Sequence, residues 1–150
     1  MFSSQRLFSI LRKTMMPEAQ LLDFVRRYTA AWCSQDPASV AMFYSPTGSL
    51  TINGGEPAVG REAITQSAKG FMDAFPDLQV EMAGLEVRDE GVVYRWTLNG
   101  TNSGPGGRGH QVRISGFEKW RIGDDGLISE SQGHFDSAEY ERQVAGGVAS

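Results

Sequence analysis

Three runs in the second half of the chain determine the fold: VVYRWTLNGT (92–101), QVRISGFEKWRI (111–122) and LISESQGHFD (127–136). They are rich in β-branched and aromatic residues, as strands are. The glycine-rich segment 104–109 separates the first two, and the turn Asp124-Asp125-Gly126 separates the second from the third. A further strand over Leu78–Arg88 precedes them, joined by the hairpin-type link Asp89-Glu90-Gly91. The second half of the chain therefore predicts four consecutive antiparallel strands.

The first half predicts three helices and one short strand. The first helix begins near Pro17 and carries an apolar stripe at helical spacing, made of Leu21, Val25, Tyr28 and Trp32. Asp36-Pro37 predicts the start of a second helix that continues to Tyr44. A short strand over Gly48–Asn53 follows. The third helix spans Gly60–Ala74, and its apolar face consists of Ile64, Ala68, Phe71 and Phe75.

Helices early in the chain and strands late in it predict an α+β fold rather than an alternating α/β fold. After the last strand, Ser137 can cap a short C-terminal helix. A strongly curved antiparallel sheet, with the N-terminal helices over its concave face, would bury the apolar stripes. Such an arrangement leaves a pocket between helices and strands, and pockets of this kind hold ligands.

The composition narrows the range of partners. The chain has 150 residues, 40% of them hydrophobic, a net charge of −4 and a pI near 5.2, which argues against nucleic acid as a partner. Cys33 is the sole cysteine and there are two histidines, so we expect no metal site and no disulfide. No apolar stretch approaches the ~20 residues of a membrane span, so no membrane partner is expected. A cytoplasmic location fits this composition best.

The first sixteen residues differ from the rest. Residues 1–16 contain three cationic residues and no acidic one. We interpret them as a flexible leader, or as an extension upstream of a start at Met15 or Met16. A transit-like amphipathic segment is the alternative. Residues 17–146 are predicted to form one domain, and residues 147–150 a tail.

Several segments in a particular order carry a family resemblance. They are the strand from Val92 to Gly104, the run Ile114–Phe117 with Trp120–Ile122, the turn Asp125–Ile128, and an ending with Glu130, Asp136, Tyr140 and Gln143. The early helix with Tyr28 and Trp32 fits as well, as does the helix start Gly60–Ile64. With this order and spacing, residues 18–146 resemble the SnoaL-like polyketide cyclases of the nuclear transport factor 2-like superfamily.

The resemblance implies a conical α+β barrel with an internal pocket, often in a homodimer. Family cyclases close a ring by an intramolecular aldol reaction, with an aspartate as acid–base group and no cofactor; Asp136 matches that position. Three features depart from the family pattern. Asn102 stands where the family often has histidine, Gln132 stands where many members have tryptophan, and the loop 105–109 is short.

Asp136 and His134 are the predicted catalytic pair. Residues two apart on a strand point to the same face, so the two side chains would project together. A carboxylate in an apolar pocket has a raised pKa and can serve as a base near neutral pH, and a neighbouring histidine can relay its proton. The alternative is that Asp136 only caps the C-terminal helix, because aspartate is a common N-cap.

Several further side chains are candidates for contact with a substrate. Glu118 interrupts an apolar strand phase, which is costly unless the acid is paired or functional, although a strand end turned to solvent is an equal alternative. Arg95 could bind an enolate, but its strand phase favours exposure. Asn102 could donate to an oxyanion or be a turn residue, and Gln132 shares the strand phase of His134. Six aromatic residues on core-facing stripes could serve as core or as pocket wall: Tyr28, Trp32, Tyr44, Phe71, Phe75 and Trp96.

These observations favour a small-molecule enzyme that uses cofactor-free acid–base chemistry, most concretely an aldol-type cyclisation of a small carbonyl or polyketide-like compound. A non-catalytic ligand-binding or dimerisation module of the same fold is one alternative. An epoxide hydrolase or dehydratase on this scaffold is another. A polar outer sheet face with Arg113, Ser115, Lys119 and Arg121 would be the surface for a homodimer.

Overall fold

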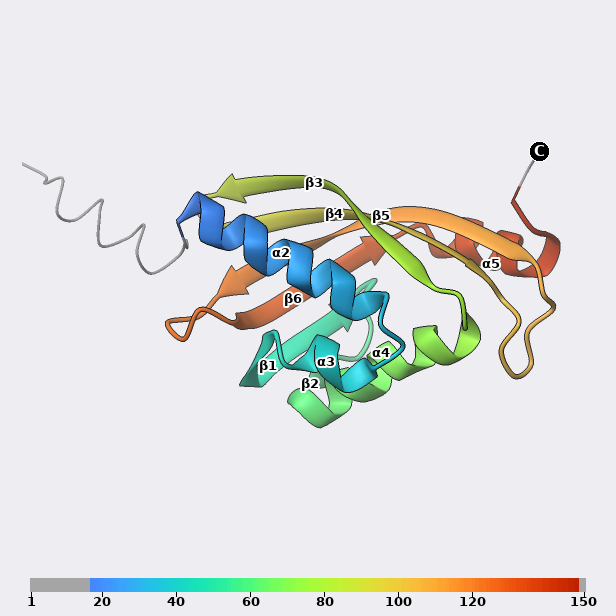
Figure 1. Cartoon of the computed structure of the whole chain (residues 1–150), viewed down its shortest axis with the longest axis horizontal. Helices are drawn as coiled ribbons and strands as arrows, with labels where there is room; N and C mark the ends of the chain where they lie inside the picture. The colour runs from blue at the N-terminus through green and yellow to red at the C-terminus, as the bar shows by residue number, and fades with distance from the viewer. Residues whose placement is uncertain (1–16, 149–150) are drawn as a thin grey trace, which may run out of the picture.

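One curved sheet carries the strands in the order β2-β1-β6-β5-β4-β3 (Figure 1). The computed structural model describes residues 17–148. Its elements are, in chain order, α2 (Glu18–Trp32), α3 (Pro37–Ala41), β1 (Tyr44–Ile52), β2 (Ala58–Val59), α4 (Arg61–Ala74), β3 (Gln79–Arg88), β4 (Gly91–Thr101), β5 (Gln111–Ile122), β6 (Ile128–Phe135) and α5 (Ser137–Gly146). Neighbouring strands are antiparallel except β1 and β6, which run parallel. The predicted α+β class is confirmed, whereas the leader predicted over residues 1–16 lies outside the described residues.

The predicted elements are present, but the junction between the second helix and the first strand differs from the prediction. The second helix ends at Ala41, and β1 begins at Tyr44 rather than at Gly48. The reason is tertiary: Tyr44 pairs with Ile128 of β6, and the Phe43 carbonyl accepts a hydrogen bond from the Ile128 backbone N–H at 2.9 Å. A register shift between Tyr44 and Ser49 accommodates Pro46, which has no N–H to offer a strand partner. The two-residue strand β2 was not predicted, because so short a segment has no readable periodicity.

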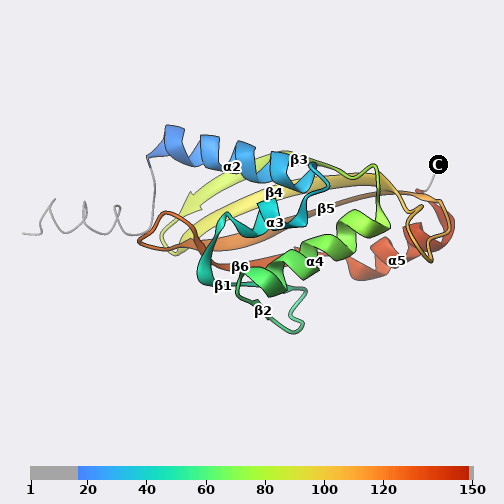
Figure 2. The ribbon, with the colours of Figure 1, turned by 60° about the horizontal axis from the view of Figure 1, so that its bottom comes forward.

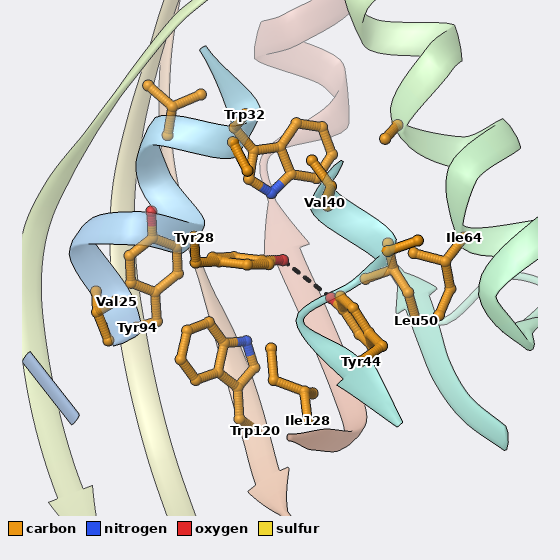
Figure 3. Packing of buried hydrophobic residues seen from close by; sticks show 14 of the residues in the cluster. Val25, Tyr28, Trp32, Val40, Tyr44, Leu50, Ile64, Tyr94, Trp120 and Ile128 are labelled. Carbon is orange, nitrogen blue, oxygen red and sulfur yellow. Dashed lines mark hydrogen bonds between the residues drawn. The ribbon is translucent and has the colours of Figure 1, made fainter. Parts of the chain in front are cut away.

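Helices α2, α3 and α4 lie over the concave face of the sheet, and the core lies between them and the strands (Figures 1 and 2). The predicted stripe of α2 faces this core, since Leu21, Val25, Tyr28 and Trp32 are all buried. Figure 3 shows Tyr28 between Trp32 and Trp120, with its hydroxyl directed at Tyr44. The Tyr28 ring meets Trp120 edge-on at 5.0 Å between centroids, a favourable arrangement for aromatic rings.

The strand register decides which side chains face the helices. Trp96 of β4 pairs with Gly116 of β5, and Glu118 of β5 pairs with Gly133 of β6, so these four residues belong to the inner face. The opposite phase of β5 points outward, and its residues Arg113, Ser115, Lys119 and Arg121 are exposed as predicted. Whether a second copy packs on that face remains a prediction. Between residues 17 and 148, every helix is too short or too polar to cross a membrane.

Candidate functional site

An apolar cavity of about 60 Å³ lies between the helices and the inner face of the sheet. Its wall comes from α2, α4 and five of the strands and consists of Trp32, Leu50, Ile52, Phe71, Val80, Tyr94, Trp96, Leu98, Glu118, Gly133 and Phe135. Ile52, Phe71 and Phe135 are only half-buried, whereas Glu118 is 7% exposed. The cavity therefore has an apolar outer end and a carboxyl group at its inner end.

Glu118 is held by three hydrogen bonds, all made to the same carboxyl oxygen. Oε1 accepts from the Tyr28 hydroxyl at 2.8 Å, from Trp120 Nε1–H at 2.8 Å and from the Ser131 hydroxyl at 2.9 Å. None of the side chains between residues 17 and 148 donates to Oε2 in the same way. Because Glu118 also contributes to the cavity wall, Oε2 is the oxygen available to a ligand.

Burial raises the pKa of the Glu118 carboxyl above its ordinary value, and the hydrogen bonds from Trp120, Tyr28 and Ser131 offset only part of that rise. Burial likewise raises the pKa of Tyr28, and the nearby Glu118 charge adds to the rise. The Tyr28 proton is committed to Glu118, so Tyr44 donates its own hydroxyl proton to the Tyr28 oxygen, 2.9 Å away. The site is thus a carboxyl group with a raised pKa, supported by a buried tyrosine pair.

A second polar group on the wall has no partner. Trp96 Nε1 is the single side-chain nitrogen or oxygen in the described part of the chain that is fully buried without a hydrogen bond. Buried N–H groups are nearly always paired, and leaving one unpaired costs about 1–3 kcal/mol. Two residues of the wall therefore carry groups that the protein itself does not use: Glu118, through the acceptor Oε2, and Trp96, through its buried indole N–H.

The predicted pair Asp136 and His134 is placed elsewhere, which corrects the expectation that both project into the pocket. Strand β6 ends at Phe135, and the exposed Asp136 is the N-cap of α5, where its Oδ1 accepts from the Glu139 backbone N–H at 3.0 Å. His134 has the outward phase of β6 and lies against the Phe117 ring, with 5.1 Å between ring centroids. Neither side chain belongs to the cavity wall, and Asp136 rather than Ser137 caps the helix.

Three further predicted contacts also lie away from the cavity. Arg95 is on the outer face of β4 and binds Glu86 at 2.8 Å, as its strand phase favoured. Gln132 has the outward phase of β6 and donates to Glu130 at 3.3 Å. Asn102 is buried at the end of β4, where its side chain donates to the Ala74 carbonyl at 3.3 Å and joins the strand to the end of α4. Alternation along the strands, and the loop geometry at residue 102, turn these groups away from the wall.

The other candidates do meet at the site. Trp32, Phe71, Trp96 and Glu118 form part of the cavity wall, and Tyr28 lies directly behind it through its bond to Glu118. Sequence reasoning missed Ser131, which donates to Glu118, and Tyr44, which donates to Tyr28. Ser131 shares the strand phase of Gly133 and Phe135, so correct phasing of β6 would have placed it inward. Tyr44 was expected to face the core, but its bond to Tyr28 was not foreseen, because it was assigned to a helix.

No group of three or more histidine, cysteine, aspartate or glutamate residues that could hold a metal ion occurs between residues 17 and 148. The cavity itself contains a single ionisable carboxyl group, Glu118.

Comparison with known proteins agrees with this architecture. The family model described as SnoaL-like polyketide cyclase matches residues 22–144. No curated protein matched the sequence.

Solved structures with the same fold are distant in sequence. A protein from Jannaschia sp. CCS1 described as a SnoaL-like polyketide cyclase superposes with a TM-score of 0.74 at 17% identity, over 87% of this chain and 95% of that one. AclR of Streptomyces galilaeus, described as a hydroxylase, superposes with a TM-score of 0.73 at 22% identity, over 86% of this chain and 98% of that one. A Catenulispora acidiphila protein with a ketosteroid isomerase-like fold superposes with a TM-score of 0.72 at 16% identity, over 87% of this chain and 95% of that one. At these identities the likeness concerns the fold alone.

Proposed function

Because this chain belongs to the SnoaL-like polyketide cyclase family, we propose that it catalyses cofactor-free proton transfer on a small carbonyl compound, with Glu118 as the acid–base group. The observation that carries the proposal is a cavity whose wall is hydrocarbon except for a few polar atoms, and whose ionisable group has one carboxyl oxygen free. An aldol-type cyclisation is the concrete form of this chemistry.

The three donors on Oε1 decide which oxygen carries the proton. Oε1 already accepts hydrogen bonds from Tyr28, Trp120 and Ser131, so a proton added there would have to displace one of them. The proton therefore resides on Oε2, on the cavity side. This arrangement aims the exchangeable proton at the ligand, and the fixed hydrogen bonds keep the carboxyl plane from rotating.

In the proposed reaction, ionised Oε2 removes a proton from a carbon next to a carbonyl group, and an enolate forms. The enolate carbon then forms a bond to a second carbonyl carbon of the same molecule, whose oxygen becomes an alkoxide. Oε2 returns its proton to that alkoxide, so Glu118 ends the cycle ionised, as it began. A raised pKa favours the first step, because a carboxylate of higher pKa is a stronger base toward the C–H group.

Two other functions on the same scaffold are less well supported. An epoxide hydrolase of this superfamily would need an arginine between two acids, but Arg95 lies on the outer face and a second acid does not line the cavity. A non-catalytic binding module would use the same wall, and the experiment below distinguishes it. The small volume, about 60 Å³, favours a compact reacting group inside the cavity in either case.

The test uses a matched pair of carboxyl-to-amide variants. Proton transfer is measured as exchange of α-hydrogens for deuterium in a small diketone, followed by NMR in D₂O, so that no ring closure is required. Glu118→Gln is expected to lower the protein-catalysed exchange rate by roughly 10²–10⁴-fold, the usual contribution of a general acid–base group. Asp136→Asn, which can still cap α5, is expected to leave the rate unchanged.

Each outcome separates the interpretations. Loss of exchange in Asp136→Asn with retention in Glu118→Gln would return the catalytic role to Asp136 and refute the proposal. Retention in both variants, or no exchange above the uncatalysed rate in the unaltered protein, would leave a binding module. A heteronuclear NMR spectrum of each variant checks that the fold is kept.

A further inference from the structure

The indole of Trp96 is held in one position on the cavity wall by its neighbours. Across the β4–β5 pair it lies over Gly116, where a Cβ would come within 2.6 Å of Trp96 Cζ2. Phe135 of β6 meets the ring at 6.0 Å between centroids, with an interplanar angle of 67°. A glycine beneath the ring and an aromatic residue at its side thus define where Nε1 lies.

This ring position leaves a donor without a partner inside the protein. Trp96 Nε1 is fully buried, and none of the groups between residues 17 and 148 accepts its hydrogen. Two other polar groups of the wall are occupied: the Tyr94 hydroxyl is 2.6 Å from Thr29 Oγ1, and Glu118 Oε1 has three donors. An unpaired buried donor in a native structure calls for an explanation, and a ligand acceptor in the cavity supplies one.

The unused donor and the unused acceptor are close enough for one small molecule to meet both. Trp96 pairs with Gly116, and Glu118 is the next inward residue along β5, so Trp96 and Glu118 are diagonal neighbours on the same face. Diagonal positions on a sheet are about 7–8 Å apart, within reach of long side chains. The remaining wall residues are hydrocarbon or glycine apart from the Tyr94 hydroxyl and the Trp32 indole N–H, and the wall carries no arginine, lysine or histidine.

We propose that the Trp96 indole N–H donates a hydrogen bond to the carbonyl oxygen of the ligand, which sets the substrate class as neutral compact ketones rather than carboxylates or hydrocarbons. This inference rests on the proposed function, since it orients the carbonyl so that its α-carbon faces Glu118 Oε2. A carboxylate ligand would bring a negative charge into an apolar cavity with no cation to balance it. A hydrocarbon would leave the indole N–H unpaired.

Three probes of similar shape test the claim: cyclohexanone, methylenecyclohexane and cyclohexanecarboxylate. Methylenecyclohexane replaces the carbonyl oxygen by a CH₂ group and so removes only the acceptor. Binding is followed in ¹H–¹⁵N spectra through the indole resonance of Trp96, which is assigned by its absence in Trp96→Phe. We expect cyclohexanone to bind roughly three- to tenfold more tightly than the alkene, the usual range for one net hydrogen bond. It should also shift the indole proton downfield, whereas the carboxylate should bind most weakly.

Two variants separate the hydrogen bond from the shape of the cavity. Trp96→Phe keeps an aromatic ring but removes the donor, so this variant should bind the ketone and the alkene about equally tightly. Gly133→Ala adds a methyl group to the wall at ordinary contact distances, 3.6 Å from the Thr51 carbonyl oxygen and 3.7 Å from Glu118 Cγ. It should weaken ketone and alkene to a similar extent and leave the preference intact.

The proposal is overturned if the unaltered protein binds the ketone and the alkene equally, if it binds neither, or if Trp96→Phe retains the preference. These are binding measurements and do not depend on catalysis. A failed deuterium-exchange test with an intact ketone preference would therefore refute the role of Glu118 and leave the role of Trp96 standing. Normal deuterium exchange without a preference for the ketone would refute the proposed role of Trp96 alone.

Discussion

Replacement of Glu118 by glutamine should change the pH dependence of stability in a direction that the structure specifies. Glutamine keeps a carbonyl oxygen at the position of Oε1, so Tyr28, Trp120 and Ser131 retain their acceptor. The amide replaces Oε2, which faces the cavity and has no donor to lose. Glu118→Gln therefore imitates the neutral carboxyl group without its ability to ionise.

The sign follows from the raised pKa of Glu118, whose main cause is burial. Above the unfolded value of about 4.3, the unfolded chain loses its proton while the folded protein keeps it. Between that value and the folded pKa, Glu118 therefore reduces the free energy of unfolding by up to about 1.4 kcal/mol per pH unit as the pH rises. Below pH 4 the two proteins should differ by less than about 1 kcal/mol.

The assay is urea unfolding of both proteins at several pH values from 4 to 8. The difference in the free energy of unfolding should shift steadily in favour of Glu118→Gln as the pH rises, and then level off above the folded pKa. A difference that stays flat, or that favours the unaltered protein at higher pH, would show that the three hydrogen bonds outweigh burial and would refute the reasoning.

Glu139 provides a control with the opposite sign. Hydrogen bonds from Arg142 and Gln143 lower the pKa of its carboxyl to about 2. Its contribution to stability should be present above the unfolded pKa and lost as the pH falls toward 2. Glu139→Gln should therefore change the free energy of unfolding least at the acid end of the titration. Glu118→Gln should change it most at the neutral end.

Substitutions at two positions, Asp136 and Gly116, test the geometry around the site. Asp136→Ala should lower the free energy of unfolding by about 1 kcal/mol, because it removes the N-cap bond to the Glu139 N–H, and Asp136→Asn should restore most of that loss in urea unfolding. Gly116→Ala should cost about 1–3 kcal/mol, because its Cβ would come within 2.4 Å of the His134 carbonyl oxygen and 2.6 Å of the Trp96 ring. An unchanged Trp96 indole resonance in Gly116→Ala would contradict the close packing of these two residues.

The strands were the most predictable part of the chain. The predicted strand over Gln111–Ile122 coincides with β5, and the hairpin at Asp89-Glu90-Gly91 joins β3 to β4 as expected. These elements can be recognised from their composition and turn residues, because both act locally. The start of β1 at Tyr44 was not predictable in this way, because it depends on pairing with Ile128, which is far away in the sequence.

The site was predicted less well than the fold, for a related reason. Glu118 was singled out because a lone acid in an apolar phase is costly, and the structure shows three donors that offset part of this cost. His134 and Asp136 were favoured by spacing, but β6 ends at Phe135 and its inward phase is that of Ser131, Gly133 and Phe135. Spacing states which residues share a face but does not state which face is inside.

The sequence by itself determined the order of helices and strands, the apolar stripe of α2 and the family to which the chain belongs, because these depend on local pattern and on the spacing of motifs. Only the tertiary structure decided which carboxyl group enters the cavity. Glu118 is brought to Tyr28, 90 residues away in sequence, and to Ser131 on the next strand. The physical reason is that the environment of a side chain is created by residues distant in sequence, which folding brings together. That environment sets the pKa of Glu118, leaves its second oxygen free and leaves the Trp96 indole N–H unpaired.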